Sequence, residues 1–285
     1  MKRFWKDFWW LLVYTFVGAV AVVMLTLLVT KRTEGVVMLH LVQWLQTVLM
    51  FWLPACLWAR CYKKERVCDV MHYRLPDAWQ LGLTAVLMLV SLPALDALAT
   101  WCEALPLPAW LQDYAQQTSA AQEQVVALLI SPGGVGGWTE LVLLMCVGTA
   151  VAEESMFRGA LLRCLVRSQN TGEEPRWKRL WVALVVGLIF SACHGDVYGF
   201  VPRCLLGAVF TYLVYWTGSL WPSVLAHAMN NLWALIEMKE APQLLEQLGA
   251  STVIVLGSVA LSAAVLCAIR QRRHSVTSKV ASAPR

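Results

Sequence analysis

Apolar segments long enough to cross a lipid bilayer recur along the whole chain, with short polar stretches between them. About 20 residues of helix, at 1.5 Å per residue, cross the roughly 30 Å of hydrocarbon in a bilayer. Because backbone groups in lipid must be satisfied within the segment, such runs fold as helices. The composition agrees, with 59% hydrophobic and only 14% charged residues. The sequence therefore predicts an all-α, polytopic membrane helical bundle that forms a single integral membrane domain over residues 1–285.

We expect about eight transmembrane helices, of which the fifth to the seventh are short. Their expected ranges are residues 9–30, 36–58, 79–101, 138–162, 180–195, 201–217, 222–238 and 250–269. The first run is too long for the apolar region of a signal peptide, so we expect it to remain as the first span. The polar residues 274–285 are expected to form a cytoplasmic tail.

Positive residues gather in alternate loops, and this pattern predicts the orientation of the bundle. They follow the expected spans two, four and eight: Arg60, Lys63, Lys64, Arg66, Arg74, Arg163, Arg167, Arg176, Lys178, Arg179, Arg270, Arg272 and Arg273. The connection 102–137 has no Lys or Arg and contains Glu103, Asp113 and Glu123. Both termini are therefore predicted to be cytoplasmic and this connection to lie outside. Among the positive residues that depart from the rule are Lys31, Arg32 and Arg203.

The remaining features of the composition exclude some functions and leave others open. The net charge of +5 is spread over loops and ends, with no basic run interleaved with aromatics, so we expect no nucleic-acid partner. The nine cysteines form no CxxC pair and are interpreted as small apolar residues. Part of the connection 102–137 is expected to be an amphipathic interfacial helix, either a plain connection or a cover over a cavity.

Three charged residues interrupt the fourth apolar run: Glu153, Glu154 and Arg158. A charged residue at the centre of a bilayer costs about 2.5 to 3.5 kcal/mol on insertion scales, so such a cluster indicates function. Glu154 and Arg158 are spaced i, i+4 and share one face of a helix. We therefore expect Arg158 to pair with Glu154. Glu153 is turned about 100° away and is expected to face the interior of the bundle.

Two later spans carry polar residues at the same helical spacing. Phe190 and His194 share one face of the fifth span, and His227 and Asn231 share one face of the seventh. Counted at 1.5 Å per residue, Glu153, His194 and Asn231 lie at comparable depths of roughly 15 to 22 Å, so they are able to meet in one cavity. Taken singly, a His or Asn within a span is more often a residue that joins two helices by a hydrogen bond.

A carboxylate, two imidazoles and a carboxamide in one pocket suit amide hydrolysis. A carboxylate with a nearby His orients a water and takes its proton, while a second His and an Asn amide donate hydrogen bonds to the developing oxyanion. Alternatively, Glu153, His194 and His227 would bind Zn²⁺, which would acidify the water. Asp196 follows His194 closely and would either tune that imidazole or cap a helix end.

The segments Glu153-Glu154-Ser-Met-Phe-Arg158, Phe190-Ser-Ala-Cys-His194 and His227-Ala-Met-Asn-Asn231 resemble the EExxxR, FxxxH and HxxxN motifs of a known family. This is the CAAX protease and bacteriocin-processing family, CPBP, also called ABI or type II CAAX prenyl endopeptidases. Each motif alone is weak, but the three occur in order, each on its own apolar helix. Residues 138–238 are therefore interpreted as the motif-bearing catalytic core.

The resemblance implies an eight-helix intramembrane endopeptidase. By motif position, Glu153 and His194 would activate the water, and His227 and Asn231 would stabilise the oxyanion. The supporting residues would be Glu154, Arg158 and the packing residue Phe190. We expect no cofactor, because no cysteine or third histidine completes a compact zinc ligand set.

The expected substrate is a membrane-associated or prenylated-like peptide or protein, met within the lipid bilayer. Because the loops are compact and no targeting signal is present, a bacterial inner membrane is the expected location. Two other functions remain open: a proton- or ion-coupled membrane transporter, and a non-catalytic family member that acts as a membrane scaffold or immunity protein. No internal repeat typical of transporters is present in the sequence.

Overall fold

The computed structural model describes residues 2–29, 35–130, 134–166, 175–240 and 251–281. These residues form helices and connecting turns and contain no strand. Six helices are long and apolar enough to cross a membrane: Phe4–Leu28, Val36–Tyr62, Ala78–Glu103, Gly134–Leu165, Phe200–Thr217 and Thr252–Gln271. The prediction of an all-α, polytopic membrane bundle is confirmed.

Two more helices occupy the remaining expected ranges. They are α10 (Arg176–Ala192) and α12 (Trp221–Glu240), and both fall outside the set of six. α10 has only 17 residues, and α12 carries several polar side chains. Helices therefore occur at all eight expected positions, and the number that crosses the membrane stays a prediction.

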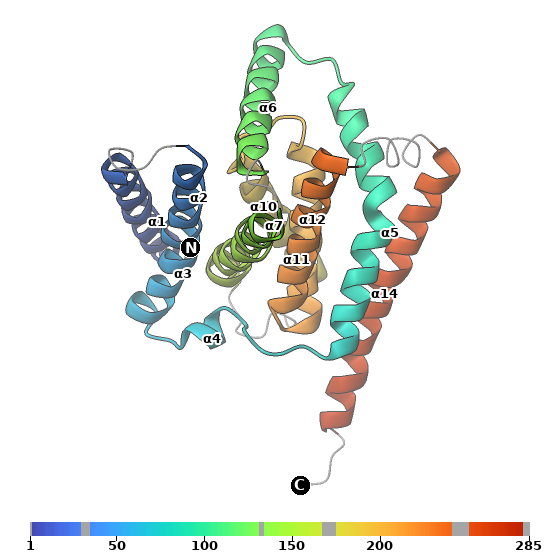
Figure 1. Ribbon diagram of the computed structural model, residues 1–285. Helices are drawn as coiled ribbons and strands as arrows, with labels where there is room; N and C mark the ends of the chain where they lie inside the picture. The colour runs from blue at the N-terminus through green and yellow to red at the C-terminus, as the bar shows by residue number, and fades with distance from the viewer. Residues whose placement is uncertain (1, 30–34, 131–133, 167–174, 241–250, 282–285) are drawn as a thin grey trace.

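The helices at the two edges of the molecule frame its centre. The first edge is built from α1 (Lys2–Val29), α2 (Val36–Gln46), the π-helical η1 (Thr47–Trp52), α3 (Leu53–Leu57) and the π-helical η2 (Trp58–Tyr62). At the other edge, α5 (Ala78–Glu103) and α14 (Thr252–Ala281) run side by side (Figure 1). α14 continues into the expected tail, residues 274–285, of which 282–285 lie outside the described residues.

The centre holds α10, α12, α11 (Phe200–Thr217) and the long fourth span. This span begins with α7 (Gly134–Leu141) and continues through η3 (Val142–Gly148), α8 (Thr149–Glu154), η4 (Ser155–Leu161) and α9 (Leu162–Leu165). The π-helical η3 and η4 were not predicted, and they flank the turn that carries both glutamates. Single π-helical turns are common at functional sites because they re-aim neighbouring side chains.

The pairing of α5 with α14 depends on a proline. Pro93 lies inside α5 and disturbs the backbone ladder there. Ser258 of α14 inserts at this point, since its Oγ donates to Val90 O at 2.6 Å and accepts from Ala94 N at 3.2 Å. A side chain from the neighbouring helix thus makes hydrogen bonds to the backbone of α5 on either side of the proline.

A glycine contact brings α10 and α11 close together beside the charged residues. A Cβ on Gly187 would lie 2.5 Å from Cys204 O and 3.0 Å from Ala208 N, and both atoms are backbone of α11. A Cβ on Gly207 would lie 2.8 Å from Gly187 Cα. Small residues allow helices in membranes to approach this closely.

We expect Gly187→Ala to lower the stability of the folded protein by about 1 to 3 kcal/mol, because the backbone of α11 has to move to accommodate the methyl group. Thermal unfolding in detergent measures the effect. Gly82→Ala is the matched control, because nothing lies within 4 Å of a Cβ at that helical position. Equal melting temperatures for the two variants would show that the close approach of α10 and α11 is not required.

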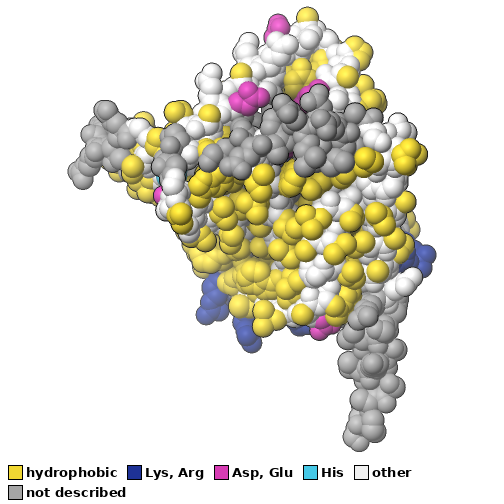
Figure 2. Space-filling model, turned by 45° about the vertical axis from the view of Figure 1, so that its right-hand side comes forward, with side chains coloured by type: hydrophobic (Ala, Val, Ile, Leu, Met, Phe, Trp, Pro, Cys, Tyr) yellow, Lys and Arg dark blue, Asp and Glu magenta, His cyan; other side chains and the backbone are white. Residues whose placement is uncertain are grey.

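The two ends of the bundle differ in charge. The basic end comprises the positive residues of the loop 60–74, of α9 and of the first turn of α10, and two contacts tie its parts together. Arg163 Nη2 donates to Glu65 Oε2 at 3.0 Å, and Ser219 Oγ, in the turn before α12, donates to Arg74 O at 2.6 Å. α6 (Ala109–Ile130) stands at the opposite end (Figure 1). In Figure 2 the Lys and Arg side chains gather at the lower end, whereas most of the acidic side chains in view lie at the upper end.

Candidate active site

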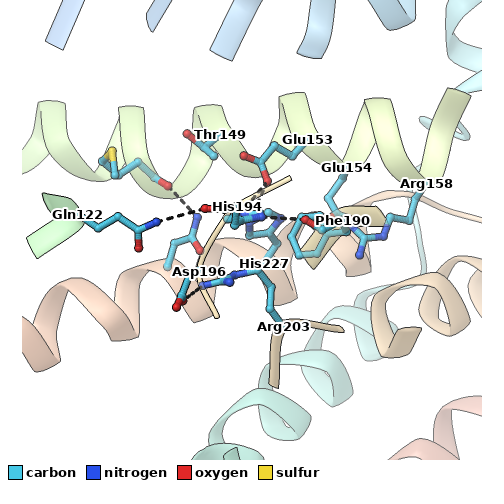
Figure 3. A network of polar contacts seen from close by, with 12 residues as sticks. Gln122, Thr149, Glu153, Glu154, Arg158, Phe190, His194, Asp196, Arg203 and His227 are labelled. Carbon is cyan, nitrogen blue, oxygen red and sulfur yellow. Dashed lines mark hydrogen bonds and ion pairs between the residues drawn. The ribbon is translucent and has the colours of Figure 1, made fainter. Parts of the chain in front are cut away.

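The predicted polar residues meet at the centre of the bundle (Figure 3). α8 supplies Glu153 and Glu154, the turn after α10 supplies His194, and α12 supplies His227. Glu153 Oε2 lies 3.9 Å from Nε2 of His194 and 3.9 Å from Nε2 of His227. The structure thus brings Glu153, His194 and His227 together, whereas the meeting of Asn231 with Glu153 and His194 stays a prediction. His194 itself lies just beyond the end of α10, where the chain has already turned.

Glu154 is fully buried and forms the sealed side of the site. Its Oε1 accepts a hydrogen bond from Arg158 Nη1 at 2.6 Å, which confirms the predicted pair. Two further partners were not predicted. Oε1 also contacts His227 Nδ1 at 2.8 Å, and Oε2 accepts a hydrogen bond from Ser223 Oγ. Glu154 thus joins the fourth span to α12.

Arg158 is also fully buried, and aromatic rings surround its guanidinium. Its Nη2 donates to Gly207 O at 3.0 Å, so it reaches α11 as well. The guanidinium lies 4.5 Å from the centre of the Phe190 ring, a distance typical of cation–π contact. The Phe190 ring also contacts the rings of His194 and His227, at centroid distances of 4.9 and 5.6 Å. The prediction that Phe190 packs beside the polar residues is confirmed.

The partner behind each imidazole distinguishes the two histidines. A carboxylate paired with Arg158 accepts hydrogen bonds only, so His227 Nδ1 donates to Glu154 and the ring directs Nε2 toward Glu153. A buried carboxylate in this position holds the ring in one orientation. His194 Nδ1 instead donates to the backbone carbonyl of Phe190 at 2.8 Å. With Nδ1 as the donor, Nε2 of the neutral His194 imidazole is an acceptor.

The space between Glu153 and His194 suits a water molecule. Glu153 Oε2 is buried and has no hydrogen-bond partner among the described residues. The carboxylate oxygen and the imidazole Nε2 are both acceptors, and they lie 3.9 Å apart. A water oxygen about 2.8 Å from each atom would donate one proton to each. The arrangement therefore provides two bases for one water.

The same three side chains fit a zinc ion less well. Ligand atoms around a tetrahedral zinc lie about 3.4 Å apart, because each metal–ligand distance is about 2.0 to 2.1 Å. Here the oxygen of Glu153 is 3.9 Å from Nε2 of either histidine. No group of three His, Cys, Asp or Glu side chains in the described part of the chain has the geometry of a metal site. No chemical step is therefore assigned to a metal.

Asn231 lies one turn beyond His227 on α12, and its contact was not predicted. Its Nδ2 donates to Met145 O in η3 at 2.9 Å. This hydrogen bond uses one of the two amide N–H groups and fixes the side chain against the fourth span. Ser223, His227 and Asn231 recur every four residues along α12, and this spacing was the signal in the sequence from which Ser223 could have been found.

Asp196 and Arg203 form an ion pair next to His194. Asp196 Oδ2 accepts from Arg203 Nη2 at 2.9 Å, and its Oδ1 accepts from Gly199 N at 3.1 Å. Of the two alternatives for Asp196, the structure shows the cap of the turn before α11. Arg203, which departs from the charge pattern of the loops, is paired with a carboxylate. Lys31 and Arg32, which also depart from it, lie outside the described residues.

Comparison with known proteins shows one family to which part of the chain is similar. A family model described as type II CAAX prenyl endopeptidase Rce1-like matches residues 135–233. The matched segment contains every residue of the site described above. No curated protein and no solved structure matches the chain. Residues 135–233 are therefore similar to the Rce1-like family of type II CAAX prenyl endopeptidases.

Proposed function

We propose that the protein is an intramembrane endopeptidase that hydrolyses a peptide bond of a membrane-associated peptide or protein, with a water activated by Glu153 and His194. The observation that carries this proposal is the buried, unpartnered Glu153 Oε2 with an imidazole Nε2 on either side of it at 3.9 Å. The family match favours a protease over a transporter. We also propose a bacterial inner membrane as its location, with the basic end and both termini facing the cytoplasm.

In the proposed reaction, Glu153 and His194 hold the water, and Glu153 takes one of its protons as general base. The water oxygen attacks the carbonyl carbon, and the carbonyl oxygen becomes an oxyanion. His227, supported by the carboxylate of Glu154, donates a hydrogen bond to this oxyanion, together with the second amide N–H of Asn231. When the C–N bond breaks, the proton passes from Glu153 to the leaving nitrogen. The products are a carboxylic acid and an amine.

The remaining polar residues position the catalytic ones. Glu154 fixes the ring of His227, Arg158 holds Glu154, and Phe190 fixes His194 through its carbonyl. Each partner is buried, so its geometry is maintained without water. Such neighbouring groups hold a site close to its productive geometry.

A cleavage assay on the purified protein in lipid vesicles, with a panel of membrane-associated peptides, tests the proposal. We expect His194→Ala to reduce cleavage by about a hundredfold or more, because one of the two groups that hold the water is lost. Asn230→Ala is the control, since this residue is next to Asn231 and belongs to no proposed step. If no peptide is cleaved by the wild type, or if His194→Ala cleaves as fast, the proposal is wrong.

Metal removal is the second arm of this assay. We expect a strong chelator to leave cleavage unchanged, because the proposed water is activated by Glu153 and His194 alone. Loss of cleavage that returns on addition of Zn²⁺ would instead assign Glu153, His194 and His227 as zinc ligands. The same samples measured for bound metal provide an independent readout.

A further inference from the structure

The site is sealed on one side and open on the other. Toward the basic end, Glu154, Arg158 and Ser223 are each 0% exposed. On the opposite side, the side chain of His194 is 31% exposed, compared with 5% for His227. A substrate that reaches Glu153 therefore passes the turn that carries His194.

This turn lies at the end of the bundle that faces away from the positive loops. α10 begins at Arg176, at the basic end, and runs away from it to Ala192. α11 then returns from Phe200 to Thr217, and the next turn contacts Arg74 through Ser219. The open side of the site is thus separated from the basic end by the length of α10.

α6 lies over the open side. Gln122 Nε2 donates to His194 O at 3.2 Å, and Tyr114 OH donates to Gly195 O at 3.3 Å. Figure 3 shows Gln122 reaching the turn at His194. Both contacts are exposed, and α6 belongs to the connection 102–137, which has no Lys or Arg. The prediction of a helix in this connection is confirmed, and its contacts place it beside the entrance.

We propose that substrates enter this site from the extracytoplasmic face, beside α6, and that they are exported or outward-facing membrane peptides. Positive loops are retained on the cytoplasmic side, so the basic end faces the cytoplasm and the His194 turn faces outward. This inference rests on the proposed peptidase function for its substrate. It concerns the side of entry, however, which is measured without any cleavage.

Cys193 is a natural reporter for this test, because it is exposed and directly precedes His194. Cys68 is also exposed and lies in the basic loop, so it is the matched control. Intact spheroplasts and inside-out vesicles are treated with a membrane-impermeant maleimide, and labelling of the wild type is compared with that of Cys193→Ala and Cys68→Ala. We expect Cys193→Ala to lose most of the label added to spheroplasts. Cys68→Ala should lose label only in inside-out vesicles.

The proposal would be overturned if Cys193→Ala lost label only in inside-out vesicles, or if it were labelled like the wild type in both preparations. A second reporter, Gln122→Cys on the exposed face of α6, should be labelled from the same side as Cys193. Labelling of both reporters from outside in a protein that cleaves none of the peptides would keep the outward entrance and refute the peptidase function. Cleavage of a peptide by a protein whose two reporters are labelled only from the cytoplasmic side would support the peptidase function and refute the outward entrance.

Discussion

Glu153→Gln is expected to reduce peptide cleavage by about a hundred- to ten-thousandfold, the range that a positioned general base contributes. The amide has nearly the same shape as the carboxylate, so the fold and the contacts of Glu154 should persist. What is lost is the acceptor that takes the proton from the water. Single-turnover cleavage in lipid vesicles measures the effect, with thermal unfolding as the check on folding.

Glu140→Gln is the matched control for this variant. Glu140 lies on the same span, its side chain is 51% exposed, and it contacts His40 rather than the site. The Glu140→Gln variant should cleave the peptide at a rate within about twofold of the wild-type rate. If Glu153→Gln retains full activity, or if both variants lose activity equally, Glu153 is not the general base.

Arg158→Met is expected to lower the free energy of unfolding by about 3 to 5 kcal/mol, because it leaves the charge of Glu154 buried without its partner. Both side chains are 0% exposed, so water cannot replace the lost contact. Chemical or thermal unfolding in detergent measures the change. Arg163→Met is the control, because its ion pair with Glu65 is partly exposed (13% and 31%) and should contribute under about 1 kcal/mol.

The double variant Glu154→Gln with Arg158→Met separates stability from activity. Removing both charges removes the unpaired one, so much of the lost stability should return. Cleavage by the double variant should stay well below that of the wild type, because His227 then lacks the carboxylate behind its ring. A double variant as unstable as Arg158→Met alone would show that packing of the guanidinium on Phe190, rather than the charge of Glu154, decides stability.

The spacing of residues along single helices predicted much of the site. The i, i+4 relation indicated the pair of Glu154 and Arg158, and the apolar runs indicated the helix that carries His227 and the helix that ends just before His194. These features depend on one helix at a time, and helical geometry fixes them. The contacts of Glu154 with Ser223 and of Asn231 with Met145 join different helices, so their existence depends on how the helices pack.

The distinction between the two histidines could not be predicted for the same reason. A sequence does not state which group lies behind each ring. Here His227 is backed by the carboxylate of Glu154 and His194 by the carbonyl of Phe190. The π-helical η3 and η4 are a further case, because nothing in their residue patterns distinguishes them from an ordinary α-helix. Only the three-dimensional arrangement shows that they flank the two glutamates.

A cryo-EM map of the Glu153→Gln protein with an uncleaved peptide bound in a lipid nanodisc tests the proposed chemistry most directly. The expected map shows the scissile carbonyl carbon next to a water that lies between residue 153 and His194, with the carbonyl oxygen directed at His227. A peptide seated away from these residues, or a metal ion in place of the water, would contradict hydrolysis by a Glu153 and His194 pair.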